Sequence, residues 1–444
     1  MTSSKQSLSP RGRFVCGWLA AALLLLLGPG AAPALDRYQQ VVLTLGSWRT
    51  DDIVPMRTFL DRFEQTHPRI RIVFDPTPAP DYDAVLTAQL RAGTGPDLVY
   101  LRSFEVSRDL YERGYLASLA GFDPVKARFQ SSSLDPWRGR DGVVYAVPLI
   151  ATAHGVYYNQ DLFRRLGLAV PTSWEGLIDS CRLILAEGRV PLANASGESW
   201  TVLECLLLNI LPNFIGGRGG RLEYLSGARC FDDADMIAAF AALEELRPFL
   251  PEHQEMLRYQ DSLQLFAQGR ALMWFGGSWD IGYLETQAPA LRWSVFAPPP
   301  PDGKPAQLTF HPDAGVGLNA ASTHREAAEE FLAWLCEPET GALLAELMPG
   351  FYSMHNEHRA LSNRHAQAFL ALTLDRPTDI RFVWDQLRAG HPDGYTLMRD
   401  AAVAVMQGRM SPREAAATIQ AGLAQWFEPA RACARKPGDA ELDQ

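Results

Sequence analysis

The sequence predicts an α/β protein with two lobes or domains. Short apolar runs alternate with amphipathic stretches of helical length, which is typical of βαβ units around a parallel sheet. The chain has 444 residues, more than one ordinary hydrophobic core accommodates. Hydrophobic residues make up 47% of it and charged residues 21%, as in globular proteins.

The alternation is clearest near the start of the chain. An apolar run over 41–45 predicts a strand, and apolar residues at helical spacing follow over 56–63. Residues 70–74 alternate as a strand does, residues 82–92 repeat as a helix does, and 98–101 form a third apolar run. Strand and helix thus follow one another in the order that a parallel sheet requires.

The middle of the chain begins with an extended segment over 143–159, long enough to pass from one lobe to the other. Helical patterns then fill 174–187, 200–211 and 233–247. Between the last two, the sequence GGRGGR (216–221) lacks the lysine of a phosphate-binding loop and predicts a surface turn.

The last third of the chain starts with a proline-rich stretch over 297–301, which predicts a linker or rim loop. Extended structure resumes over 315–319. Thr323 and Glu326 then have the spacing of a capping box at the start of a helix. The C-terminal part is predicted to be helical, with a frayed tail beyond about residue 430.

The N-terminus has the pattern of a cleavable signal peptide over residues 1–34. Three basic residues precede an apolar run over 14–27, and Ala32-Pro33-Ala34 supplies the cleavage site. This pattern predicts export to the periplasm. The net charge of −10, without clustered Lys and Arg, argues against a nucleic-acid partner.

Five cysteines follow the signal peptide, namely Cys181, Cys205, Cys230, Cys336 and Cys433. An oxidising compartment permits disulfides, but the odd number leaves at least one cysteine unpaired. A bridge between Cys205 and Cys230 and buried free thiols are the two interpretations.

Parallel strands also predict where a ligand binds, because ligands lie outside the carboxyl ends of such strands. Trp48, Arg49 and Asp51 follow the first predicted strand, whereas Arg102 and Ser103 follow the third. We therefore expect these side chains around one crevice.

Motifs for catalysis, metals and cofactors are not found. The stretch GGSWD (276–280) lacks the final glycine of a nucleophile elbow. His355 and His358 are three residues apart without a convincing third ligand, so surface histidines are the preferred interpretation. The sequence predicts no enzyme, no metal site and no cofactor.

Three tryptophans follow turn residues, in GSW (46–48), GESW (197–200) and GGSW (276–279). Such a ring either caps the core or forms a wall of a binding site. Aromatic walls with a few polar groups are the general pattern of small-molecule pockets, and sugar rings stack on them. In GGSW, Gly276 and Gly277 leave space for close approach. We favour a wall at Trp279.

Six stretches run through the chain in a fixed order and cover most of it: FLDRFEQTHPRIRIVF (59–74), LTAQLRAGTGPDLVYL (86–101), VYAVPLIATAHGVYYNQDLF (144–163), PTSWEGL (171–177), GRALMWFGGSWDIG (269–282) and GVGLNAASTHREAAEEFLAWL (315–335). The series resembles the extracellular solute-binding proteins of the maltose- and glycerol-phosphate-binding type, which feed ABC importers. Each stretch alone is degenerate, whereas the ordered series is specific.

The resemblance implies a two-lobe periplasmic-binding-protein fold, in which each lobe is a mostly parallel sheet flanked by helices. A hinge would join the lobes through crossings near 149–154, 311–315 and 347–351. The implied domains are lobe one at 36–150 and 314–347, lobe two at 151–311 and 350–430, and a tail at 431–444.

The resemblance also matches individual ligand-contact positions. Trp48, Arg49 and Asp51 match the contacts after strand one. Tyr82 and Asp83 match a tyrosine–acid pair. Arg102 and Ser103 stand where many relatives carry Asp, a departure from the pattern. The remaining matches are Thr152 at the hinge, Trp200 at an aromatic wall, the platform of Gly277, Ser278 and Trp279, Asp313 at the second crossing, and Tyr395 and Arg399 in lobe two.

The implied function is capture of a carbohydrate between two lobes by a monomer and delivery to ABC permease subunits, so that contact with the membrane is indirect. One alternative keeps the fold and binds a glycerol phosphate, a polyamine or another polar metabolite, with Arg102 and Arg399 available to a phosphate. The others are an exported hydrolase and a sensory binding protein without a transport partner.

Overall fold

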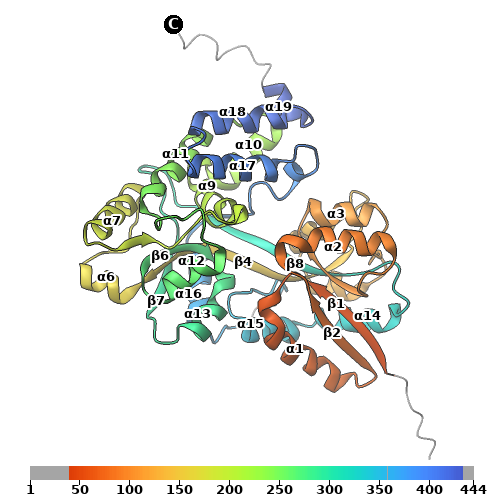
Figure 1. Cartoon of the computed structure of the whole chain (residues 1–444). Helices are drawn as coiled ribbons and strands as arrows, with labels where there is room; N and C mark the ends of the chain where they lie inside the picture. Colours follow the sequence, from red (N-terminus) through yellow and green to blue (C-terminus); the bar gives the residue numbers. More distant parts are fainter. Residues whose placement is uncertain (1–39, 358, 434–444) are drawn as a thin grey trace, which may run out of the picture. The chain divides into compact units, whose positions relative to one another are not determined.

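The computed structural model describes residues 40–357 and 359–433 (Figure 1). The predicted signal peptide over residues 1–34 lies outside the described residues, as do residues 434–444 of the expected tail.

The predicted alternation at the start of the chain is confirmed. Strand β1 (Val41–Ser47) pairs in parallel with β2 (Ile70–Pro76) and with β3 (Leu98–Arg102). Helices α1 (Ile53–Thr66) and α2 (Ala79–Ala92) connect them. Since all three strands run the same way, their carboxyl ends meet at one edge.

Two long strands form the middle of the sheet. Strand β4 (Ala146–Asn159) lies antiparallel to β8 (Leu308–Leu318), with irregular register around Ile150. Strand β8 also pairs antiparallel with β3. Figure 1 shows β4 and β8 side by side as the longest strands of the molecule.

The remaining strands complete a nine-stranded sheet. Strand β6 (Ala271–Gly277) lies antiparallel to β4 and parallel to β5 (Val190–Leu192). Strand β7 (Trp293–Phe296) pairs antiparallel with β4, and β9 (Thr378–Asp379) pairs in parallel with β8. The strand order is β2-β1-β3-β8-β4-β6-β5.

This α/β sheet is mixed, whereas the sequence predicted mostly parallel sheets in both lobes. The prediction holds for β1, β2 and β3, but every pair made by β4 is antiparallel. Strand β4 is a continuous chain segment that enters the second half of the sheet directly, without a crossover helix to set a parallel direction.

Helices surround the sheet. In the first half of the chain they are α3 (Glu105–Glu112), α4 (Asp123–Arg128), α5 (Ser131–Leu134), α6 (Gln160–Leu166), α7 (Trp174–Ala186), α8 (Ser199–Thr201), the π-helix η3 (Val202–Leu207), α9 (Leu208–Ile215) and α10 (Gly217–Ser226). Further along they are α11 (Ala234–Leu246), α12 (Tyr259–Ala267), α13 (Ile281–Gln287), α14 (Arg325–Leu335), α15 (Pro338–Leu347), α16 (Arg364–Leu374), α17 (Gly394–Met406), α18 (Pro412–Leu423) and α19 (Glu428–Cys433). Short 3₁₀ turns are η1 (Thr50–Asp52), η2 (Asp135–Trp137), η4 (Arg247–Phe249), η5 (Ser278–Asp280) and η6 (Gln386–Arg388).

The long strand β4 belongs to more than one hydrophobic cluster. Its first residues, such as Val147, pack with Leu43 and Phe59 of β1 and α1. Its later residues split between two further clusters, with Val156 in one and Tyr157 in the other. Strand β4 therefore connects separate cores, as a crossing segment does. The residue bounds of the two lobes stay a prediction.

The glycine-rich stretch GGRGGR is not a surface turn. It begins α10, and its Arg221 is buried, where it donates two hydrogen bonds to Asp379 at 2.7 and 2.9 Å. A Cβ at Gly220 would stand 1.7 Å from the carbonyl oxygen of Ile215. The glycine thus permits close approach of two backbones, which composition alone does not reveal.

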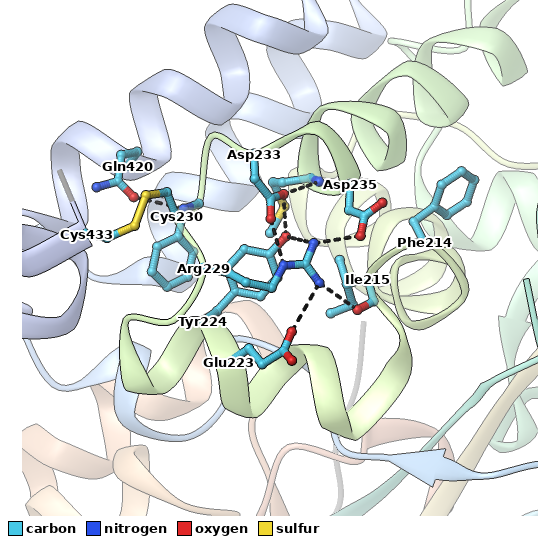
Figure 2. Close-up of polar contacts among 12 residues, drawn as sticks. Phe214, Ile215, Glu223, Tyr224, Arg229, Cys230, Asp233, Asp235, Gln420 and Cys433 are labelled. Atoms are coloured by element: carbon cyan, nitrogen blue, oxygen red, sulfur yellow. Dashed lines mark hydrogen bonds and ion pairs between the residues drawn. A yellow bond between two sulfur atoms is a disulfide. The ribbon is translucent and has the colours of Figure 1, made fainter. Parts of the chain in front are cut away.

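The disulfide joins Cys230 to Cys433, with Cα atoms 5.6 Å apart (Figure 2). The interpretation that Cys205 pairs with Cys230 is therefore wrong. The other interpretation, buried free thiols, holds for Cys181, Cys205 and Cys336. Because α19 runs to Cys433, the expected fraying is wrong for residues up to Cys433. The two cysteines are 203 residues apart, so no local pattern could pair them.

Arg229 lies beside this disulfide and ties the start of α11 to the chain before it (Figure 2). Its guanidinium donates to Asp233 and Asp235, each at 2.7 Å, and to the hydroxyl of Tyr224 at 2.9 Å. These contacts hold the loop that carries Cys230.

Helix α14 begins without the predicted capping box. Its N-cap is His324, whose side chain makes no capping hydrogen bond. Instead, Ser322 accepts a hydrogen bond from the backbone N–H of His324 and donates to Asp97 across the structure. The proline-rich stretch 297–301 is confirmed as irregular chain between β7 and β8.

Within the described residues, no single helix is long and apolar enough to cross a membrane. One pair of helical segments, Ser199–Ile215 and Gly217–Ser226, meets the criteria of length and composition only when taken together, with a bend of 88° between them.

Candidate binding site

A cavity of about 370 Å³ lies beyond the carboxyl ends of β1 and β3. Residues from η5, from β8 and from the segment around η6 complete its wall. It is lined by Trp48, Arg49, Ala79, Pro80, Asp83, Arg102, Ser199, Trp200, Glu204, Trp279, Asp313, Arg381, Trp384, Arg388, Tyr395 and Arg399.

The structure brings nine of the predicted site residues together at this cavity: Trp48, Arg49, Asp83, Arg102, Trp200, Trp279, Asp313, Tyr395 and Arg399. Three of them follow β1 or end β3, where the rule for parallel strands placed them. The others come from segments far apart in the chain, which only the fold unites.

The other six predicted residues do not line this cavity. Asp51 is exposed on η1, and Thr152 is fully buried in β4. Ser103 is buried and bonded to His311 at 3.0 Å between Oγ and Nε2. The phenol of Tyr82 donates to the carbonyl of Tyr100 at 2.8 Å and so lies in the core beside β3.

Gly277 and Ser278 act behind the wall of the cavity. A Cβ at Gly277 would stand 1.9 Å from the ring of Trp279, so the glycine provides the space in which that ring lies. Ser278 is buried, donates to the carbonyl of Gly350 and accepts a hydrogen bond from the N–H of Ala153 at 3.1 Å. Its hydroxyl therefore joins β4 to the chain near residue 350.

Four tryptophans line the cavity: Trp48, Trp200, Trp279 and Trp384. The first packs edge-on against Tyr82 and Tyr100 and is buried, whereas Trp200 and Trp279 are partly exposed. Aromatic faces of this kind bind apolar ring surfaces of a ligand.

Hydrogen bonds fix the orientation of the Trp279 ring. Its Nε1 donates to the hydroxyl of Tyr259 at 2.7 Å, and that hydroxyl donates to Asp280. Asp280 also accepts from Nε1 of Trp274 at 3.2 Å. Burial raises the pKa of Asp280 from 3.8 to about 7, because the charged carboxylate is poorly solvated there.

Carboxylates hold two arginines of the cavity, Arg49 and Arg102. Arg49 donates two hydrogen bonds to Asp52, at 2.8 and 2.9 Å. Burial by itself lowers the pKa of Arg49, but the charge and hydrogen bonds of Asp52, together with the charges of Asp51 and Asp313, outweigh it and the pKa is raised. Arg102 donates to Asp83 at 2.9 Å and lies over the ring of Trp48, 4.5 Å from its centroid. The two arginines are thereby presented in fixed positions.

Arg381 connects several buried polar groups around the cavity. Its guanidinium lies 3.0 Å from a carboxylate oxygen of Glu204 and 3.0 Å from one of Asp313. It also donates to Nε2 of His154 at 3.1 Å. Glu204 in turn accepts from Nε1 of Trp384 at 3.0 Å. This network links η3, β4, β8 and the segment after β9.

Two histidines in contact with Arg381, His154 and His311, are neutral. Burial, and then the charge of Arg381, lower the pKa values of His154 and His311 well below 6.5. His154 therefore accepts at Nε2 from Arg381. His311 accepts at Nδ1 from the backbone N–H of Arg381, so its other nitrogen donates to Ser103.

Sequence reasoning missed seven lining residues: Ala79, Pro80, Ser199, Glu204, Arg381, Trp384 and Arg388. A signal was available for most of the charged ones. The segment DIRFVWDQLR (379–388) places a tryptophan between two arginines outside any periodic pattern, and Glu204 is a lone charge in the apolar stretch TVLECLLLNI (201–210). Charged residues in such places are buried with partners or serve a site.

A second cavity of about 520 Å³ adjoins the first. Both are lined by Asp83, Arg102, Arg388, Tyr395 and Arg399. The second has no tryptophan in its wall, and Glu105, Glu112, Arg113 and Arg140 give it a charged character.

The arrangement suits reversible binding of a polar ligand with apolar ring faces. Among residues 40–357 and 359–433, no three His, Cys, Asp or Glu side chains are grouped to hold a metal ion. His355, expected at the surface, is buried and hydrogen-bonded to Ser353 at 2.7 Å, and His358 lies outside the described residues.

Comparisons with known proteins find relatives of this chain in sequence and in fold. Residues 49–342 match the family model described as bacterial extracellular solute-binding protein. The multiple sugar-binding protein of Streptococcus mutans is 25% identical over 293 residues, which are 63% of this chain and 67% of that protein.

Solved structures show the same fold. A chitin oligosaccharide binding protein matches with a TM-score of 0.74 at 22% identity, covering 88% of this chain and 99% of that one. The protein RafE in complex with raffinose matches with a TM-score of 0.73 at 22% identity, covering 88% of this chain and all of that one, 100%. These likenesses confirm the predicted binding-protein fold, and the family match, which spans more than half of the sequence, confirms the predicted resemblance. The chain belongs to the family of bacterial extracellular solute-binding proteins.

Proposed function

We propose that the protein captures a carbohydrate in the cavity of about 370 Å³ and delivers it to the permease subunits of an ABC importer. The observation that carries the proposal is the wall itself. Four tryptophans line the cavity together with arginines and carboxylates that ion pairs hold in fixed positions. Sugars offer C–H faces to such rings and hydroxyls to such polar groups.

Two further observations support the proposed ligand and the proposed cellular location. Relatives and solved neighbours are described as binding sugars, raffinose and chitin oligosaccharides among them. The signal-peptide pattern over residues 1–34 supports export to the periplasm, where the protein would act as a monomer.

The mechanism is capture without turnover. Trp48, Arg49 and Arg102 come from the part of the sheet around β1 and β3, and Trp200 and Trp279 come from the part around β6. A ligand that touches both sets stabilises the arrangement in which both are within reach. In this proposal, permease subunits recognise that arrangement.

The first test is calorimetric titration of the purified protein with a panel of neutral and charged mono- and oligosaccharides. The Trp279→Ala variant should bind the selected sugar about ten- to a hundredfold more weakly, since it loses the stacking surface, a change of about 1.4–2.8 kcal/mol. Trp334→Ala, which removes a partly buried ring outside the cavity, is the matched control and should leave affinity unchanged.

Two outcomes would contradict the proposal. Recovery of a cleaved sugar after incubation would indicate a hydrolase, whereas the unchanged sugar is expected by mass spectrometry. Uptake of the bound sugar should also stop when the gene is deleted from its host. Unaltered uptake would favour a sensory protein without a transport partner.

A further inference from the structure

Arg388 differs from the other arginines of the cavity because it lacks an anionic partner. Among the described residues, its guanidinium takes part in no ion pair and no hydrogen bond, and its Nη1 is buried. It lies between two rings instead, 4.5 Å from the ring centroid of Trp384 and 4.1 Å from that of Tyr395. Burial lowers its pKa, which indicates an unmet cost of holding the charge there.

The carboxylates that act on Arg388 are already engaged. Asp83 and Glu204 act on Arg388 through space, but Asp83 accepts two hydrogen bonds from Arg102, and Glu204 pairs with Arg381. Rings on either side stabilise a cation without satisfying its N–H donors. Arg388 therefore lines the cavity with a guanidinium whose N–H donors are not used by the described residues.

The position of Arg388 is as informative as its lack of partners. It lines both cavities, so it stands at the junction where the tryptophan-lined cavity adjoins the charged one. Arg102 and Arg399 line the same junction. A ligand whose ring rests on the tryptophans would thus direct a substituent toward this junction.

We propose that Arg388 binds an anionic group of the ligand, so that the carbohydrate taken by this protein carries a carboxylate or a phosphate. The inference rests on the proposed function and narrows it to acidic sugars. A planar guanidinium fork matches two oxygens of such a group at once, whereas a single hydroxyl satisfies only one donor. Arg388 sets this specificity, and the tryptophans hold the ring.

The experiment compares uronic-acid disaccharides built on galacturonate or glucuronate, their methyl esters, and the matching hexose phosphates by calorimetry. The methyl ester keeps the ring and its hydroxyls, removes the charge and adds one methyl group. We expect the purified protein to bind an acidic sugar at least tenfold more tightly than its uncharged counterpart. The arm with higher affinity, uronate or phosphate, identifies the anion.

The Arg388→Gln variant should lose about ten- to a hundredfold in affinity for the acidic sugar and less than threefold for the methyl ester, as expected for a charge-assisted hydrogen bond. Arg413→Gln removes an exposed arginine outside both cavities and should change neither affinity. In the unmodified protein, raising the salt concentration should weaken binding of the acid and leave the ester unaffected.

The two proposals fail in different ways. If a neutral sugar binds as tightly as its acidic counterpart, without dependence on salt, the role of Arg388 is overturned and sugar binding stands. An equal loss for acid and ester in Arg388→Gln would likewise overturn it. If no sugar of either kind binds, both proposals fall.

Discussion

At the scale of single residues, the position of the Trp279 ring depends on three other residues. Gly277 leaves the space for its ring, Tyr259 accepts from its Nε1, and Asp280 accepts from Tyr259. The glycines and the tryptophan are adjacent in GGSW, so the sequence predicted the space and the ring together. Tyr259 is 20 residues away, and only the packing of α12 against β6 brings it near.

The buried Asp280 makes stability depend on pH. Its pKa is about 7 in the folded protein and near its ordinary value of 3.8 in the unfolded chain. Between these values the folded state keeps a proton that the unfolded state has released. The free energy of unfolding therefore falls as pH rises through that window and levels off above about pH 7.

The Asp280→Asn variant tests this, because Asn keeps the shape of the protonated acid and cannot ionise. Urea unfolding measures this at pH values from 4.5 to 7.5. As pH rises over this range, the free energy of unfolding of the variant should increase by a few kcal/mol relative to that of the unmodified protein, at about 1.4 kcal/mol per pKa unit. Asp302→Asn, at an exposed position, serves as the control. Parallel pH profiles for Asp280→Asn and the unmodified protein would contradict the assignment.

At the scale of elements, the strands and helices near the start of the chain were predictable and some later ones were not. Residues such as Phe59 and Leu86 repeat at helical spacing because one face of each helix packs on the parallel strands. Helix α10 carries no such signal in GGRGGR, and the buried pair of Arg221 with Asp379 stabilises it from outside. Local pattern predicts an element only where local burial determines it.

The disulfide that fixes α19 yields a second prediction at this scale. Cys433→Ser should lower the free energy of unfolding by about 2–4 kcal/mol, because a cross-link over a long loop restricts the unfolded chain. Chemical denaturation with and without a reductant measures the loss. The reductant should bring the unmodified protein to the level of the variant and leave the variant itself unchanged. A loss on reduction that the variant shares would contradict this role for Cys433.

At the scale of the whole molecule, β4 and β8 connect separate hydrophobic cores, and buried polar groups lie along them. His154 belongs to β4, His311 and Asp313 belong to β8, and all three contact Arg381. Arg381 is buried between the carboxylates of Glu204 and Asp313 and also lines the cavity. It therefore contacts both the strands that connect the cores and the wall of the cavity. The same side chain therefore serves both stability and the proposed site.

The Arg381→Met variant should lower the free energy of unfolding by about 3–5 kcal/mol, because Glu204 is left buried without its cation. The double variant Arg381→Met with Glu204→Gln should cost clearly less than the sum of the two single changes. Urea unfolding of all four proteins closes the cycle. Additive costs would show that the pair does not act as a unit.

The α/β class, the strand ends where Trp48 and Arg102 lie, and the tryptophan of the GGSW turn could all be predicted from the amino-acid sequence. Each of these features depends on residues that are neighbours in the sequence, because periodicity and turn composition reflect local burial. Only the tertiary structure decided the antiparallel partners of β4, the Cys230–Cys433 bridge, and the grouping of Arg381 and Arg388 with the tryptophans. Those features join residues far apart in the chain, and long-range packing energy selects them. The local pattern around Arg381 and Arg388 marks these residues as unusual but does not name their partners.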